Sequence, residues 1–171
     1  MYWRFTFRVS LPVSNDYVTR WLNAHPLKRT ITVRQSGKVS APLTYGVFHP
    51  VILMPVHTDW EDEQQLSYIL QHEYMHIRRN DAAMKLTVAL ALCIHWFNPA
   101  AWLLYSMSSR DMELSCDECV LQWSGEDSRE AYALALIRME ERKSGLAPFC
   151  YFSKNAMEER ITAIMKPMIT T

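Results

Sequence analysis

The segment His72-Glu73-Tyr74-Met75-His76 has residue types and a spacing that are typical of a catalytic metal site. A helix turns by about 100° per residue, so two histidines four positions apart project from one face and can bind one Zn²⁺ at about 2.0–2.1 Å. Glu73 is then placed to act as general base toward a water at the metal. The alternative is an exposed helix with unrelated polar residues. The apolar neighbours Leu70 and Ile77 argue against it, because uncompensated imidazoles are costly to bury.

A catalytic zinc requires three protein ligands and one open position. Glu113 and Asp117 lie four apart on a predicted helix, which suits an arrangement where Glu113 binds the metal and Asp117 accepts a ring N–H from a ligand histidine. Cys116 and Cys119 are rivals that would complete a closed structural site, but Glu73 would then have no function. We favour a buried free thiol for Cys116. The full set of downstream candidates is His95, Asp111, Glu113, Cys116, Asp117, Glu118 and Cys119.

Peptide hydrolysis by such a site also needs a donor for the developing oxyanion and a surface that holds the substrate backbone. His95, Tyr105 and Arg110 are candidate donors, although each residue type more often serves packing or the surface. An extended peptide can pair with an edge strand, for which Leu43–Val47 and Val51–Met54 are the two candidates. Either strand can equally well serve only to build the sheet.

The elements that must position these residues differ between the two parts of the chain. In the N-terminal third, capping residues precede a short helix over 17–24, and β-branched or apolar runs predict strands over 30–34, 43–47 and 51–54. Apolar periodicity and capping signals predict that the remainder is helical, with helices over 60–79, 82–96, 98–123, 126–143 and 154–165. The prediction is one α+β domain over residues 1–171, mostly helical, with a small sheet of about three strands.

Composition restricts the function further. Eighteen basic and eighteen acidic residues cancel, so no long-range attraction to nucleic acid is expected, and no direct nucleic-acid binding is predicted. The apolar run Leu86–Phe97 is too short to span a bilayer, which needs roughly 20 residues, and predicts a buried helix or one lying on a bilayer surface. Trp96, Phe97 and Trp102 suit either a core or a lipid interface. The chain taken alone is expected to be soluble.

Together these segments resemble the BlaR/MecR-type antirepressor metallopeptidases, an integral-membrane family that includes bacterial β-lactam sensors. The resemblance covers roughly residues 30–166, with motifs in the family's order. They are a strand pair at Ala41–Gly46 and Pro50–Pro55, the helix Gln71–Asp81, the element Trp96–Pro99 with Trp102, the element Glu113–Glu118, and Glu159–Ile161.

The resemblance implies a zincin-like (gluzincin) domain holding one Zn²⁺ through His72, His76 and Glu113, with Glu73 as catalytic base and Asp117 supporting a ligand. It implies a zinc endopeptidase of a membrane-bound signal transducer, at the cytoplasmic side of the bacterial membrane. Flanking transmembrane helices would lie in a longer protein, and the bond cleaved would lie in the protein itself or in a cytoplasmic repressor. The alternative is a non-catalytic, zinc-stabilised module that acts on a partner repressor by conformational change.

Overall fold

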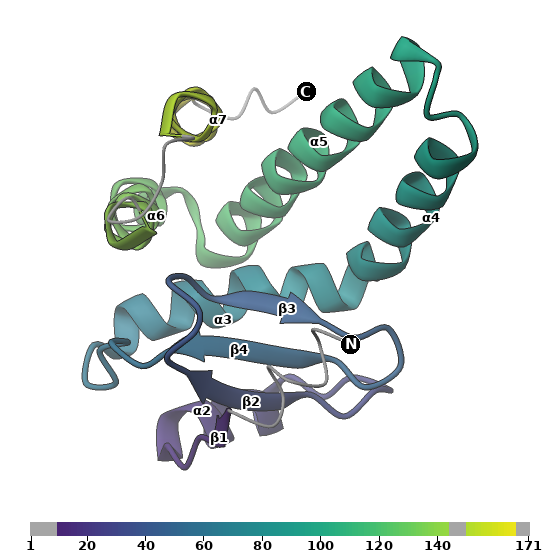
Figure 1. Cartoon of the computed structure of the whole chain (residues 1–171). Coiled ribbons are helices and arrows are strands. Elements are labelled where there is room, and N and C mark those ends of the chain that lie inside the picture. Colours follow the sequence, from purple (N-terminus) through teal and green to yellow (C-terminus); the bar gives the residue numbers. More distant parts are fainter. Residues whose placement is uncertain (1–9, 144–149, 167–171) are drawn as a thin grey trace.

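A computed structural model describes residues 10–143 and 150–166, and of residues 126, 141–143 and 150–155 it describes the backbone only. A small sheet and one short helix form the lower part of the molecule, and long helices form the rest (Figure 1). The elements in chain order are β1 Leu11–Pro12, α2 Asp16–Ala24, β2 Thr32–Ser36, β3 Leu43–Tyr45, β4 Val51–Pro55, α3 Glu63–Arg79, α4 Asp81–Ile94, α5 Pro99–Ser124, η1 Glu126–Ser128, α6 Arg129–Lys143 and α7 Cys150–Met165. The expected α+β class is confirmed.

The sheet has four strands in the order β1-β2-β4-β3, one more than expected, because two residues of β1 pair with β2. β2 and β4 are parallel, while β3 is antiparallel to β4. Every residue of β4 is buried, as a central strand covered on both faces requires. The prediction that Val51–Met54 might serve as an edge strand is therefore wrong. β3 lies at an edge of the sheet, and Gly46, with φ of 92°, makes the turn that leads from it toward β4.

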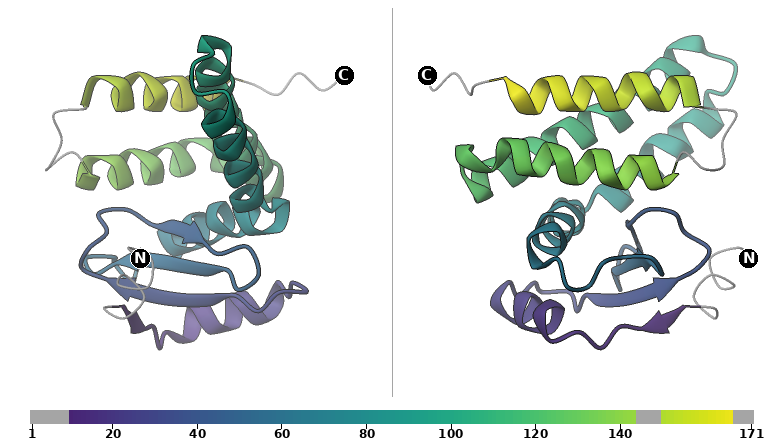
Figure 2. Two further views of the ribbon diagram at one scale, coloured as in Figure 1. Left: turned by 45° about the vertical axis from the view of Figure 1, so that its right-hand side comes forward. Right: turned by 90° about the vertical axis from the view of Figure 1, so that its left-hand side faces the viewer.

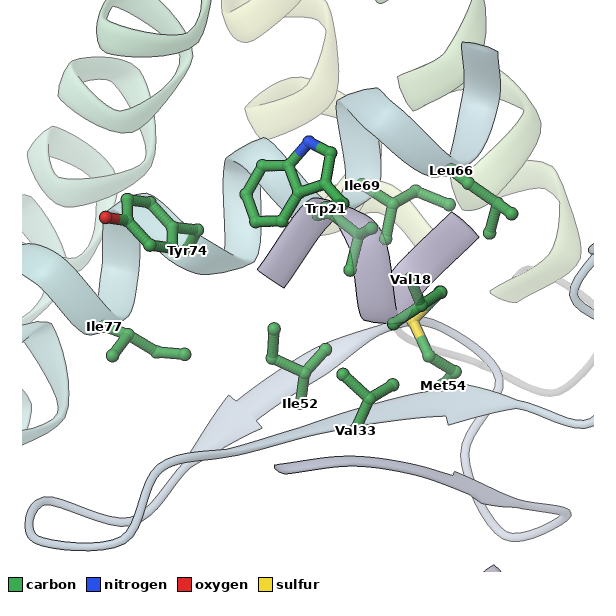
Figure 3. Close-up of a cluster of buried hydrophobic side chains, with 10 residues drawn as sticks. Val18, Trp21, Val33, Ile52, Met54, Leu66, Ile69, Tyr74 and Ile77 are labelled. Atoms are coloured by element: carbon green, nitrogen blue, oxygen red, sulfur yellow. The ribbon is translucent and has the colours of Figure 1, made fainter. Parts of the chain in front are cut away.

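One hydrophobic core lies between the sheet and helices α2 and α3. Side chains of Val33, Ile52 and Met54 point from the strands toward those helices (Figure 3). They meet a stripe of α3 residues spaced three or four apart, together with two residues of α2. The helical residues in this core are Val18, Trp21, Leu66, Ile69, Leu70, Tyr74 and Ile77. One face of α3 is thereby fixed against the sheet.

A second core lies on the opposite side of α3, where α5, α6 and α7 pack. Tyr68 and Met75 of α3 enter it beside Cys116 and Val120 of α5. Helices α6 and α7 run side by side in all views (Figures 1 and 2). α3 is consequently buried on two faces, and ten of its residues are buried. This position makes it the element on which a precise site can be built.

α4 and the first half of α5 form a hairpin that extends away from the sheet and from α6 and α7 (Figures 1 and 2). The expected buried helix over Leu86–Phe97 is wrong, because Asp81 is the only residue of α4 that is buried. Cys116 is a buried free thiol, as predicted, whereas Cys93 is exposed, and the Cys150 side chain lies outside the described residues. Within the described ranges, no helix combines the length and apolarity needed to cross a membrane.

Helix ends agree with the sequence signals to within about two residues, except at the starts of α3, α6 and α7. α6 begins at Arg129, after the short η1, rather than at residue 126, and α7 begins at Cys150 rather than at residue 154. α3 begins at Glu63 rather than Trp60, because Asp62 caps it by accepting the Gln65 N–H at 2.9 Å. It ends at Asn80, whose φ of 62° places it in the left-handed region. α5 begins at Pro99 after the cap Asn98, as predicted.

Candidate active site

The helical phase of α3 sends neighbouring residues of the predicted metal segment in two directions. Glu73 belongs to the stripe of Ile69, Leu70 and Ile77, which faces the sheet. His72 instead follows Tyr68 by one helical turn and faces α5 and α6. All side chains of this segment are buried or half-buried, with His72 5% and Glu73 4% exposed. α3 therefore directs the His72 imidazole toward α5 and α6, and the Glu73 carboxylate toward the sheet.

The two imidazoles face each other through the same ring atom. His72 Nε2 and His76 Nε2 are 3.2 Å apart, and the rings are nearly perpendicular. Glu113 on α5 completes the cluster, with its Oε2 3.5 Å from His72 Nε2 and its Oε1 3.7 Å from His76 Nε2. Ligands at about 2.0–2.1 Å from a tetrahedral zinc lie about 3.3 Å from one another. The two Nε2 atoms have the spacing of ligands to one cation, and Glu113 directs a different carboxylate oxygen to each of them.

The remaining nitrogen of His76 is held by Asp81 at the start of α4. His76 Nδ1 lies 2.7 Å from Asp81 Oδ2, so Nδ1 carries a proton and Nε2 points to the cluster. Arg29 fixes the helix break between them, because its guanidinium donates to Asn80 Oδ1 at 2.8 Å and to the carbonyls of Val47 and Ile77. Asp81 is thereby fixed relative to the end of α3.

The remaining nitrogen of His72 is held through a chain of hydrogen bonds from α5 to α7. His72 Nδ1 lies 2.9 Å from the Tyr132 hydroxyl and 3.3 Å from Asp117 Oδ1. Tyr132 donates to Asp117 Oδ1 at 2.7 Å, so the phenol oxygen accepts from His72. Arg160 of α7 donates to both Asp117 oxygens at 2.6 and 2.7 Å. Both histidines thus have Nδ1 occupied by acceptors and Nε2 turned to one point.

If both rings are neutral, two Nε2 lone pairs face each other at 3.2 Å, so this pair requires a proton or a metal cation between the two atoms. Burial opposes the charge of His76, but the Asp81 hydrogen bond outweighs it and raises its pKa to about 11. Burial likewise opposes the charge of Glu113, while the two imidazoles hold its pKa well below the usual range. The residues are therefore arranged to hold positive charge between them.

Cys116 is a rival to Glu113. Its thiol is fully buried, donates to the His72 carbonyl at 3.3 Å, and forms with the two histidines a group that could hold a metal ion. Cys119 is not in that group among the residues described, so the closed two-thiolate site finds no support there. Glu113 lines the cavity described next, whereas Cys116 is not among its lining residues.

Glu73 and Glu113, the predicted base and the predicted third ligand, both line one cavity of about 590 Å³. His72, His76 and Glu113 lie in its wall together with Glu73. Edge strand β3 supplies another wall, with Leu43 and Thr44, and the Thr44 hydroxyl donates to Glu73 Oε2. Residues of α4, α5, α6 and α7 complete it. The carboxylate of Glu73 is thus anchored to the edge of the sheet beside the imidazole pair.

The three predicted oxyanion donors lie in different places. Arg110 lines the cavity, where it pairs with Glu159. His95 lies at the end of α4, and Tyr105 is 40% exposed on α5; neither is among the described residues that line the cavity.

Sequence reasoning missed four residues that hold the cluster in place. They are Thr44, Asp81, Tyr132 and Arg160. Thr44, Asp81 and Arg160 were noted as members of motifs that match the family, and no role in the site was assigned to them. Their signal was weak because contact partners on separate elements leave no fixed spacing in the sequence.

Comparison with known proteins shows which family shares this sequence. A profile of the family described as BlaR1 peptidase M56 matches residues 7–164. The chain belongs to this family. Regulatory protein BlaR1 of Bacillus licheniformis is 27% identical to this M56 domain over 128 residues, which are 73% of the chain and 21% of that protein. The methicillin resistance mecR1 protein of Staphylococcus aureus is 26% identical over 118 residues, 68% of the chain and 20% of that protein.

The expected BlaR/MecR-type family is therefore confirmed. The M56 domain spans about a fifth of the length of these relatives. It is a peptidase-family domain shared with proteins named for regulation and methicillin resistance.

Proposed function

We propose that this M56 domain is a zinc-dependent endopeptidase in which His72, His76 and Glu113 hold one Zn²⁺ and Glu73 is the general base. The observation that carries the proposal is the convergence of two Nε2 atoms and two carboxylates on a single cavity beside edge strand β3. A purely structural metal site has no need of an adjoining carboxylate or an open cavity.

Glu113 is preferred to Cys116 as third ligand for a geometric reason. Its carboxylate oxygens each approach one imidazole, at 3.5 and 3.7 Å, and it borders the cavity where an open position is required. The Cys116 thiol is instead directed to a backbone carbonyl within the second hydrophobic core. Asp81, Tyr132 and Asp117 would orient the ligand rings.

A zinc ion bound there would polarise the scissile carbonyl and bring the pKa of a bound water toward 7. Glu73 would take a proton from the attacking water and deliver it to the leaving amine nitrogen. The Thr44 hydroxyl holds one oxygen of this carboxylate, so its orientation is set by β3. Arg110 is the remaining candidate for stabilising the oxyanion, since it borders the same cavity.

The substrate backbone would pair with β3. This strand is at an edge of the sheet, borders the cavity, and carries the residue that contacts Glu73. A peptide added to such an edge binds through main-chain hydrogen bonds and needs little sequence identity. This geometry supports the proposed endopeptidase action on an extended segment of a protein.

The biological setting is proposed from the family. Relatives carry the names of regulatory and methicillin-resistance proteins and are about five times longer than this chain. We therefore place the domain in a membrane-bound signal transducer, facing the cytoplasm, that cleaves itself or a cytoplasmic repressor. The competing function is a zinc-stabilised module that acts on a partner repressor without cleavage.

Glu73→Gln tests the proposal, with Glu61→Gln, an exposed residue before α3, as matched control. For both variants, zinc content and cleavage of a mixed-sequence fluorogenic peptide library are measured. Self-cleavage is measured in a longer protein that carries the domain. Glu73→Gln should keep about one zinc per chain and lose cleavage by about 10²–10⁴-fold, the usual contribution of a general base. Unchanged cleavage would refute the assignment, and a signalling response that survives Glu73→Gln would favour the non-catalytic module.

A further inference from the structure

The hairpin of α4 and α5 has an apolar surface that the proposed peptidase site does not use. We define the hairpin tip as residues 86–109, between Lys85 and Arg110; it contains no Asp, Glu, Lys or Arg. Ile94 and Phe97 are each 70% exposed, and Trp96 is 68% exposed. The other large exposed side chains of the tip are Leu86, Leu90, Trp102, Leu103, Leu104, Tyr105 and Met107. Exposed apolar surface of this extent marks an interaction site.

The distribution of these side chains favours a fluid apolar phase over a protein groove. Residues 102–105 are consecutive on α5 and all exposed, so they project over most of the helix circumference. On α4, Leu86, Leu90 and Ile94 form a separate stripe. A protein partner that contacts one stripe would leave the others in water, whereas lipid surrounds all of them.

Several polar groups of the turn at the end of the hairpin are bonded within the turn. The Asn98 N–H donates to the His95 carbonyl at 2.9 Å, and the Asn98 side chain accepts from the Ala100 N–H at 2.9 Å. The Trp102 indole N–H donates to the Trp96 carbonyl at 2.8 Å. Backbone groups that enter lipid must be satisfied in this way, and tryptophan is enriched at membrane interfaces.

The length of the hairpin tip limits how deeply it can enter a bilayer. The apolar part of α5, Pro99–Ser109, is about 16 Å long at 1.5 Å per residue, about half of a hydrocarbon core of roughly 30 Å. We propose that the hairpin tip inserts into one leaflet of a lipid bilayer. Lys85 and Arg110 mark the limit of insertion, because both are charged and both already pair with Glu113 or Glu159.

Insertion would also position the proposed active site. Ala82, Lys85 and Arg110, at the base of the hairpin, line the cavity that contains Glu73, as do Ser106 and Ser109 at the end of the tip nearest that base. The cavity would therefore open close to the membrane surface and favour protein segments near the bilayer. This consequence rests on the proposed function, whereas insertion itself does not.

Vesicle flotation of the protein with residues 1–171 tests insertion. The probe is phosphatidylcholine vesicles, because a chain of zero net charge whose hairpin-base cations are paired should bind zwitterionic lipid, with little change at 0.5 M salt. Phe97→Glu and, on the other helix, Leu104→Glu should each weaken partitioning by at least about tenfold, since a charge replaces a buried apolar group. Phe48→Glu, at an 81% exposed residue between β3 and β4, is the matched control and should stay within about twofold.

Three outcomes would overturn the proposal. They are no flotation of the wild-type chain, equal loss in Phe48→Glu, or self-association that Phe97→Glu abolishes while vesicles bind nothing. The last would show that a second copy covers the tip. Circular dichroism of each variant verifies folding. Glu73→Gln should float like the wild type, so failure of the peptidase assignment and failure of insertion can be distinguished.

Discussion

The third ligand can be decided by comparing Glu113→Gln with Cys116→Ala. Structural zinc sites with four ligands contribute about 10–16 kcal/mol, or about 2.5–4 kcal/mol per ligand. Loss of one ligand then weakens zinc binding by roughly 100- to 1,000-fold. The Glu113 carboxylate also lies 3.4 Å from Lys85 Nζ and 3.6 Å from Arg160 Nη1, and these cations compete with the metal. We therefore expect Glu113→Gln to lose about 100-fold, the lower end of that range.

The assay is competition with a chromophoric zinc chelator at pH 8, with unfolding followed separately in chelator. Cys116→Ala should keep zinc affinity within about threefold and lose about 1–2 kcal/mol of stability, because a buried thiol and its hydrogen bond are removed. Glu118→Gln, exposed on the same helix, should change neither quantity. Loss of zinc from Cys116→Ala with retention in Glu113→Gln would refute the reasoning and identify a site of two histidines and a cysteine.

Three other predictions follow from the groups around the ligands. Asp81→Asn should weaken zinc binding by about 10- to 100-fold in the same competition, since it orients His76; unchanged affinity would contradict this. Because Asp81 raises the pKa of His76 to about 11, zinc must displace a proton, and affinity should still rise between pH 7 and 9 instead of levelling off near 6.5. Burial opposes the charge of Asp117, but Arg160 holds the pKa of this carboxyl group below its ordinary value. The ionised Asp117 therefore stabilises the fold above a pH of about 4, and this stabilisation is lost as the pH falls through the pKa of Asp117 in the folded state. Arg160→Met should lower the unfolding free energy by about 3 kcal/mol at pH 7 in urea titrations, with a smaller difference at pH 3.

The sequence predicted most of the helices, because their signals are local. Apolar residues spaced three or four apart identified α3, and the Asn98-Pro99 pair identified the start of α5. The strand runs predicted β2, β3 and β4 to within a few residues. β1 was missed, since two residues carry no periodicity and their pairing depends on β2.

The candidate site was predictable only where spacing within one helix determines geometry. Positions 72, 73 and 76 share that property, as do 113 and 117. The contact of α3 with α5 follows from packing of the second hydrophobic core and could not be read from sequence spacing. The exposure of the hairpin tip was also unpredictable, because an apolar helix has the same sequence pattern whether protein or lipid surrounds it.

The hydrogen-bond chain to α7 connects the cluster of His72, His76 and Glu113 to the C-terminal end of the described chain. Arg160 holds Asp117, Asp117 and Tyr132 hold His72, and Arg160 also approaches Glu113. Without Arg160, the buried Asp117 and the half-buried Glu113 would each lose a cation, and His72 would lose the anchor that keeps Nε2 toward His76. We therefore expect the three ligand groups to reach their positions only when α6 and α7 are docked on α5. A change that displaces α7 would weaken zinc binding without touching a ligand.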